Sequence, residues 1–169
     1  MEQIIFVVTM LTALGTALLA GNFFAFSAFL MKALSGLSAE RGITAMQAIT
    51  ASIRSPLFLV VFFGTAALAA ILSGVAVLEW STRPGACYLL AGALLFLMGA
   101  FPITMMKNVP LNNELARAAP DTKEGRDMWA KFQSSWGMWN HIRTITSLAA
   151  CAAFIMALVE GGNPFATRG

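Results

Sequence analysis

The chain has 169 residues, of which 58% are hydrophobic and only 11% are charged. Soluble globular domains carry about 25% charged residues, so this composition excludes the soluble class and indicates an integral membrane protein. The net charge of +3 is accounted for by topology and contact with anionic lipid, and it gives no reason to expect a nucleic-acid partner.

Four apolar runs predict membrane-spanning helices. The runs 3–31, 55–78 and 84–106 have 29, 24 and 23 residues without Asp, Glu, Lys or Arg, and roughly 20 suffice to span as a helix. The fourth run, 144–159, has 16 residues and spans only if the polar residues before it approach the hydrocarbon. We therefore predict one all-α domain over residues 1–169, an integral membrane four-helix bundle with short amphipathic helices in the cytoplasmic loops. Its predicted spans cover about residues 4–31, 56–78, 84–106 and 140–160.

The basic residues predict the orientation of these spans. Nine of them lie in the loops that follow the first and third spans, up to Arg143, whereas only Arg83 and Arg168 lie on the other side. By the positive-inside rule, both termini face outward and the two long loops are cytoplasmic. In a bacterial cell this predicts the inner membrane.

The first half of the chain supplies three candidate binding residues. Asn22 is an amide within an apolar span, so it either bonds to a neighbouring helix or lines a cavity, to which Phe26 would add an aromatic wall. Residues 38–54 predict an amphipathic helix at the cytoplasmic surface, where Gln47 is a candidate polar contact. The second span carries no charge, and we interpret it as scaffold.

Three asparagines follow the third span. Asn108 comes first, Pro110 is expected to fix a turn, and Asn112 or Asn113 could cap a short helix. Capping explains one asparagine but not three. At least one is therefore available to face a ligand.

The stretch WAKFQSSWGMWNHIR, residues 129–143, leads into the fourth apolar run. Wound as a helix at about 100° per residue, it gathers three indoles, a phenyl ring, an amide and a guanidinium on one arc. These side chains belong to Trp129, Phe132, Trp136, Trp139, Asn140 and Arg143. Polar groups at the edge of the hydrocarbon are costly and indicate a functional site, whereas an aromatic belt with a snorkelling arginine is the alternative.

Metal and thiol chemistry find little support in the residues. Cys87 and Cys151 form no C-x-x-C pair, and the single histidine, His141, belongs to no cluster with metal-ligand spacing. We therefore expect no metal and no cofactor. A haem held by His141 and a methionine is the alternative.

Several segments together resemble a known family. NFFAFSAFLMKAL with the downstream MQAI, then NVPLNNEL, then W-x-x-F-x-x-x-W-x-x-WN-x-x-R are similar to the anthrone oxygenase-like family of small four-span membrane proteins, long described as a domain of unknown function. The resemblance covers nearly the whole chain. Thr50 stands where the family usually has asparagine, and Phe132 where it often has tyrosine. These departures leave the substrate open.

The resemblance implies a chemistry, because characterised fungal relatives oxidise anthrones to anthraquinones with molecular oxygen and without a metal or organic cofactor. The substrate must lose a proton to become an electron-rich enolate. Histidine is the residue type that suits a general base, so His141 is the candidate for this role. However, His141 lies about 100° from Asn140 around the helix and could be an ordinary interfacial histidine. Arg143, Asn108 and Asn140 would act with it by donating hydrogen bonds to the oxyanion. The residues expected to bind the substrate are Trp129, Phe132, Trp136, Trp139, Asn112, Asn22, Phe26 and Gln47.

We therefore predict a membrane-embedded, cofactor-independent oxygenase or oxidase of the monooxygenase type. Its expected partners are a lipophilic aromatic molecule, anthrone-like or quinol-like, molecular oxygen and the lipid bilayer, and a homo-oligomer remains open. The alternatives are a non-catalytic binding protein or carrier of lipophilic molecules and a structural membrane subunit. No acidic residue lies in the interior of a predicted span, which argues against proton-coupled transport.

Overall fold

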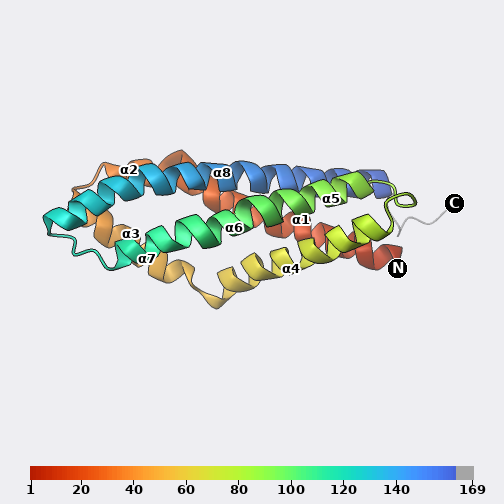
Figure 1. Cartoon of the computed structure of the whole chain (residues 1–169), viewed down its shortest axis with the longest axis horizontal. Helices are drawn as coiled ribbons and strands as arrows, with labels where there is room; N and C mark the ends of the chain where they lie inside the picture. Colours follow the sequence, from red (N-terminus) through yellow and green to blue (C-terminus); the bar gives the residue numbers. More distant parts are fainter. Residues whose placement is uncertain (163–169) are drawn as a thin grey trace.

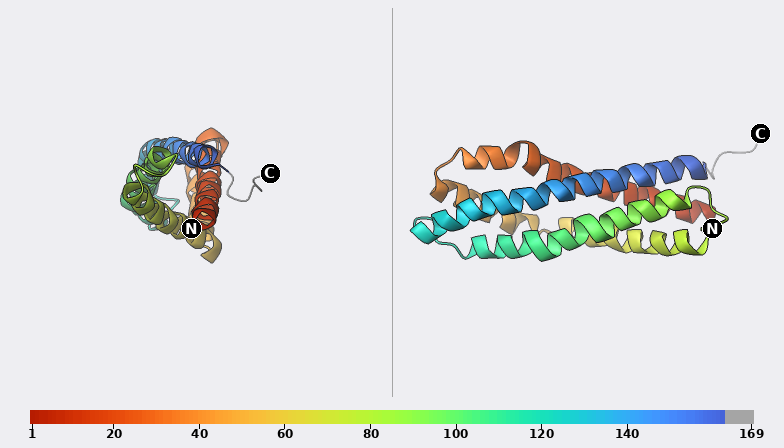
Figure 2. Two further views of the ribbon diagram at one scale, coloured as in Figure 1. Left: turned by 90° about the vertical axis from the view of Figure 1, so that its right-hand side faces the viewer. Right: turned by 45° about the horizontal axis from the view of Figure 1, so that its top comes forward.

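The computed structural model describes residues 1–162, and every regular element within them is helical. Four helices in this part of the chain are long and apolar enough to cross a membrane, which confirms the predicted all-α bundle (Figure 1). They cover Glu2–Ser35, Pro56–Leu78, Ala86–Ala116 and Lys123–Gly161. Viewed along the bundle, they surround a common axis (Figure 2). Arg168, which was counted for the orientation, lies outside the described residues.

The four long helices comprise ten of the eleven elements. The first joins α1 (Glu2–Ala25), the π-helical segment η1 (Phe26–Leu30) and α2 (Met31–Ser35). The second is α4 (Pro56–Leu78) and the fourth is α8 (Lys123–Gly161). The third joins α5 (Ala86–Leu94), η2 (Leu95–Ala100), α6 (Phe101–Ile103), η3 (Thr104–Asn108) and α7 (Val109–Ala116). The remaining element, α3 (Ala39–Ile53), connects the first long helix to the second, as the amphipathic pattern predicted.

The third long helix does not turn at Pro110, and the predicted turn there is wrong. Pro102 and Pro110 are each the second residue of an α-helical segment that directly follows a π-helical one. In a regular α-helix a proline ring clashes with the carbonyl one turn earlier, and the wider π turn relieves that clash. The helix therefore continues to Ala116, and Asn112 lies inside it rather than capping a separate helix.

The two ends of the bundle differ in the contacts that hold their helices together. We call one end the α3 end; it consists of α3, α7 and the start of α8. The helix α8 has 39 residues and is therefore about 58 Å long, so its start extends well beyond a hydrocarbon layer of roughly 30 Å. Gln47 fastens α3 to this end, because its Nε2 donates to the carbonyl oxygens of Leu115 (2.9 Å) and Ala118 (3.0 Å). Leu115 lies in the last turn of α7 and Ala118 lies two residues beyond its end, so Gln47 acts as a helix cap there.

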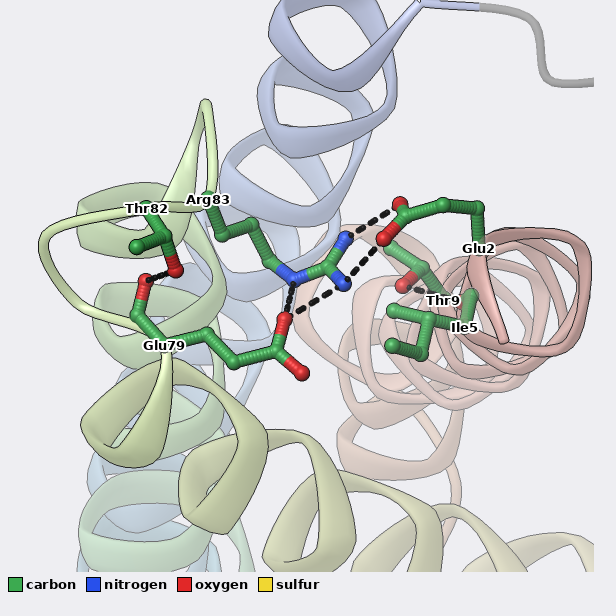
Figure 3. Close-up of polar contacts among 6 residues, drawn as sticks. All are labelled: Glu2, Ile5, Thr9, Glu79, Thr82 and Arg83. Carbon is green, nitrogen blue, oxygen red and sulfur yellow. Dashed lines mark hydrogen bonds and ion pairs between the residues drawn. The ribbon is translucent and has the colours of Figure 1, made fainter.

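The opposite Arg83 end is held by ion pairs (Figure 3). Arg83, in the turn after α4, donates two hydrogen bonds to the Glu2 carboxylate (3.0 Å each) and one from Nε to Glu79 Oε2 (2.7 Å). Burial alone would lower the pKa of Arg83, but these hydrogen bonds outweigh it and the pKa is raised. The contacts join the starts of the first and third long helices to the end of α4.

Between the two ends lies a close-packed apolar core. Its largest fully buried side chains come from all four long helices: Leu19, Phe23, Phe62, Leu72, Phe96 and Phe154. Gly15 of α1 brings α4 close, because a methyl group at that glycine would collide with Thr65. Small residues at such crossings allow membrane helices to approach closely.

Candidate functional site

A cavity of about 250 Å³ opens within the bundle, on the side of the core that faces the α3 end. Its volume is just below the range of about 300–1,000 Å³ that is typical of small-molecule sites. Its wall is largely aromatic and aliphatic, with polar residues from α1, α3, η3, α7 and α8 and from Arg54 between α3 and α4. The residues singled out from the sequence that line it are Asn22, Phe26, Asn108, Asn112, Trp136 and Arg143.

Arg143 is the charged group at the inner wall, and it is only 5% exposed. Its Nη2 donates to Asn140 Oδ1 (2.7 Å) and its Nη1 to Thr104 Oγ1 (3.3 Å). The guanidinium also lies over the rings of Phe23 (4.2 Å) and Trp136 (5.3 Å). Within residues 1–162 no carboxylate forms an ion pair with it. A buried charge in this state is held by dipoles and π faces alone, which is energetically costly.

Asn140 lies behind Arg143 and determines its position. The Nδ2 of Asn140 donates to the Phe23 carbonyl oxygen (2.7 Å) and to Ser27 Oγ (2.8 Å), so its Oδ1 is directed toward the guanidinium. The side chain thus ties the fourth long helix to the first. Ser27 belongs to η1, and π-helical segments of this kind are frequent at functional sites.

Four buried polar atoms of residues that line the cavity lack a partner in the described part of the chain. They are Arg143 Nε, Trp136 Nε1, Asn108 Oδ1 and Asn112 Oδ1, which amount to two donors and two acceptors. The orientation of Asn108 is set by its Nδ2, which donates to the Trp136 carbonyl oxygen (3.3 Å). An unsatisfied buried group costs about 1–3 kcal/mol. A ligand that offers both an anionic or carbonyl oxygen and a hydroxyl group would remove this cost.

The aromatic residues of α8 form a column of which one member reaches the cavity. Trp129 stacks on Phe132 (5.8 Å between ring centroids), and Phe132 stacks on Trp136 (5.5 Å). Trp136 lines the cavity and meets Phe26 edge-on (5.2 Å). Trp129 packs closely on Gly42 of α3, where a methyl group would collide with the indole. Trp129 and Phe132 therefore support Trp136 rather than line the cavity.

Three other residues expected at the site lie outside the cavity lining. His141 is exposed on the surface of α8. Trp139 is half-buried, with Lys107 Nζ 5.2 Å from its ring centroid. Gln47 is engaged with the end of α7 as described above. The expected roles of His141 as a base and of Trp139 and Gln47 as substrate contacts stay predictions.

Part of the cavity wall comes from helices without a polar pattern. The interpretation of the second span as scaffold needs correction, because α4 contributes Phe58, Leu59, Phe62 and Phe63 to the wall. This helix is apolar on all sides, so its sequence does not distinguish a cavity face from a lipid face. Thr50, one of the two departures from the family pattern, is buried in the same wall.

The donor groups of the site can be compared with what a metal or a haem requires. Among residues 1–162, no three His, Cys, Asp or Glu side chains form a group that could hold a metal ion. A haem needs an axial ligand that faces an enclosed space, whereas His141 is exposed. The polar residues that line the cavity carry amides, two hydroxyls, an indole and two guanidinium groups, which suit an oxygen-bearing organic ligand.

Comparison with known proteins gives one match. The model of a family described as anthrone oxygenase matches residues 58–153, more than half of the chain. The matched range contains Asn108, Asn112, Trp136 and Arg143, the four residues with unpaired atoms at the cavity. No match was found among curated proteins or among solved structures.

Proposed function

The chain belongs to the anthrone oxygenase family, and from this we propose that it is a membrane-embedded oxygenase of a lipophilic, anthrone-like aromatic molecule. The observation that supports the proposal most is the buried guanidinium of Arg143, which faces an apolar cavity and has no carboxylate partner in the described residues. A substrate that becomes an anion inside the cavity would supply the missing negative charge.

The proposed reaction converts the methylene group of an anthrone into a carbonyl group. One anthrone and one O₂ give one anthraquinone and one water. Loss of a proton produces an enolate whose negative charge lies on oxygen. Arg143 and the Trp136 N–H, placed beside that oxygen, would lower the free energy of the anion relative to the neutral substrate.

Oxygen then reacts with the electron-rich ring. The enolate transfers an electron to O₂, and the resulting radicals combine at the former methylene carbon to give a peroxide anion. Transfer of the remaining C–H proton to the leaving oxygen, with cleavage of the O–O bond, gives the ketone and hydroxide, and the first proton converts the hydroxide into water. The phenyl rings of Phe23, Phe58 and Phe62 would keep bulk water away from these intermediates.

The first proton must have an acceptor. In the described chain the cavity wall carries no carboxylate and no imidazole, so we propose that water at the aqueous edge of the cavity, beside the exposed lining residue Arg54, takes the proton. The protein then contributes mainly by stabilising the anion. Asn108 Oδ1 and Asn112 Oδ1 would accept hydrogen bonds from substrate hydroxyl groups.

Oxygen uptake by the purified protein in lipid nanodiscs, with anthrone as the substrate, tests this function. Wild type is expected to consume oxygen and form anthraquinone in equal amounts, and Arg143→Gln to lose at least about 100-fold in kcat/KM. Lys107→Gln, which removes a cation outside the cavity lining, is the matched control and should stay within twofold of wild type. Uptake by wild type at the background rate, or equal rates for Arg143→Gln and wild type, would overturn the proposal.

Non-catalytic binding of a lipophilic molecule is the second candidate. It is favoured by the cavity wall itself, which in the described residues offers hydrogen bonds but no general base. Quenching of tryptophan fluorescence by an aromatic ligand, combined with no oxygen uptake, would establish this alternative.

A further inference from the structure

We propose that the substrate reaches the cavity sideways from the bilayer, through an opening between the start of α4 and η3. The aromatic identity of the ligand rests on the proposed function. The opening itself rests on three residues that line the cavity and also form part of the outer surface. Leu59 and Phe63 of α4 are 41% and 47% exposed, and Met105 of η3 is 42% exposed.

The arrangement of the helices explains why the wall is incomplete here. In the described chain, the principal neighbours of α4 are α1, α5 and η2, and neither η3 nor α7 is among them. Figure 1 shows the start of α4 and the α6–α7 segment diverging toward the α3 end. The two helices meet near η2 and separate beyond it. The cavity lies where they separate.

The opening lies at a depth that suits entry from lipid. Phe63 follows Pro56, the first residue of α4, by seven residues, which is about 10 Å along the helix axis. In a hydrocarbon layer of roughly 30 Å, this position lies within the acyl chains rather than in water. The edge of the opening is apolar, formed by Leu59, Phe63, Met105 and Val109. A flat hydrophobic molecule could therefore leave the acyl chains without exposure to water.

The approaches from the α3 end and from the Arg83 end are covered. At the α3 end, Ile43 and Met46 are buried beneath the cavity, and Gln47 holds α3 on α7. Arg54 Nη2 donates to Asn113 Oδ1 (3.0 Å) and so links the start of α4 to α7 on the aqueous side of the opening. Toward the Arg83 end, the packed core around Phe96 fills the bundle. Besides the aqueous edge at Arg54, which is exposed and lines the cavity, the side facing the bilayer remains.

Chemical blocking of the opening tests this route. In a Cys87→Ala, Cys151→Ala background, Leu59→Cys and Met105→Cys are labelled with N-cyclohexylmaleimide in detergent and reconstituted in nanodiscs. Binding of anthraquinone, which is not turned over, is then followed by stopped-flow quenching of tryptophan fluorescence. We expect each label to slow association at least tenfold relative to the same unlabelled variant.

The chain offers matched controls one residue away. Val60 and Met106 are exposed on the same helices and do not line the cavity. Labels on Val60→Cys and Met106→Cys should change the association rate less than twofold. Equal rates for the two pairs of variants would overturn the lateral route while leaving the oxygenase proposal intact.

The remaining outcomes separate the two proposals. A rate that depends on the labels at positions 59 and 105, without oxygen uptake on anthrone, would retain the lateral route and reject the oxygenase. Absence of quenching in the unlabelled protein would reject both, because the cavity would then not accept a tricyclic aromatic molecule.

Discussion

The bundle contains two largely buried arginines that differ in how their charge is compensated. The side chain of Arg83 is 8% exposed and lies between two carboxylates, so its charge is neutralised within the protein. Arg143 is buried more deeply, and in the described chain it has only neutral partners and leaves Nε unbonded. A fully paired arginine stabilises the fold, whereas an incompletely paired one at a cavity is available to a ligand.

Exchange of each arginine for glutamine should separate these roles most clearly. Arg143→Gln is expected to lower kcat/KM for anthrone at least about 100-fold and to leave the thermal transition within a few degrees of wild type. The substitution removes a buried charge that has no carboxylate partner, so the expected fall in the free energy of unfolding is small. Comparable loss of activity in Arg83→Gln would contradict the division of roles.

A carboxylate introduced at the cavity should make Arg143 resemble Arg83. Asn108→Asp places a negative charge on the wall that Arg143 also lines, and it would compete with the substrate anion for the guanidinium. We expect kcat/KM for anthrone to fall at least tenfold. Asn113→Asp, at an exposed position outside the lining, is the control and should stay within twofold. An unchanged rate in Asn108→Asp would argue against an anionic substrate.

The two outer members of the aromatic column should respond differently to loss of the indole N–H. Trp136→Phe keeps a ring against Phe26 but removes the unpaired Nε1 donor at the cavity, so a fivefold to tenfold loss in kcat/KM is expected, about 1–1.4 kcal/mol. Trp129→Phe removes an indole that packs on α3 and should change kcat/KM less than twofold. Steady-state oxygen uptake measures both. Larger losses in Trp129→Phe would mean that Trp129, too, contacts substrate.

The smallest expected effects lie at the Arg83 end. Arg83→Gln removes three hydrogen bonds to carboxylates and should lower the free energy of unfolding by about 1–2 kcal/mol, with kcat/KM unchanged. Glu2→Gln should lower it by about 0.5 kcal/mol or less, because Glu2 is largely exposed and its ion pair is screened by solvent. Thermal unfolding in detergent measures both changes. A larger fall in the free energy of unfolding for Glu2→Gln than for Arg83→Gln would contradict the stabilising role of the Arg83 ion pairs.

The sequence carried enough information for the fold and for the polar part of the site. Long uncharged runs predict the membrane helices because backbone groups in hydrocarbon must bond within their own helix. The spacing of Trp136, Asn140 and Arg143 predicts one buried face of α8, as the structure shows. Asn108 could be singled out because a polar amide beside a membrane span needs a partner.

Other features could not be read from residue patterns. The wall formed by Phe58 and Phe62 is invisible in a helix that is apolar on every side. The continuation of the third long helix past Pro110 depends on π-helical turns, for which the sequence gives no periodic signal. Trp129 and Trp136 have the same residue type and share a face, so only the position of α3 shows which of them reaches the cavity.

The central claim is that Arg143 stabilises an anion inside the cavity, and the ionisation of a bound probe tests it most directly. 2-Hydroxyanthraquinone changes colour when its hydroxyl group ionises, so its pKa can be measured by absorbance in nanodiscs with and without the protein. We expect binding to wild type to lower the pKa of the probe by at least about one unit, equivalent to about 1.4 kcal/mol. We expect Arg143→Gln to remove this shift. A pKa that is unchanged or raised in wild type, or lowered equally in Arg143→Gln, would contradict the central claim.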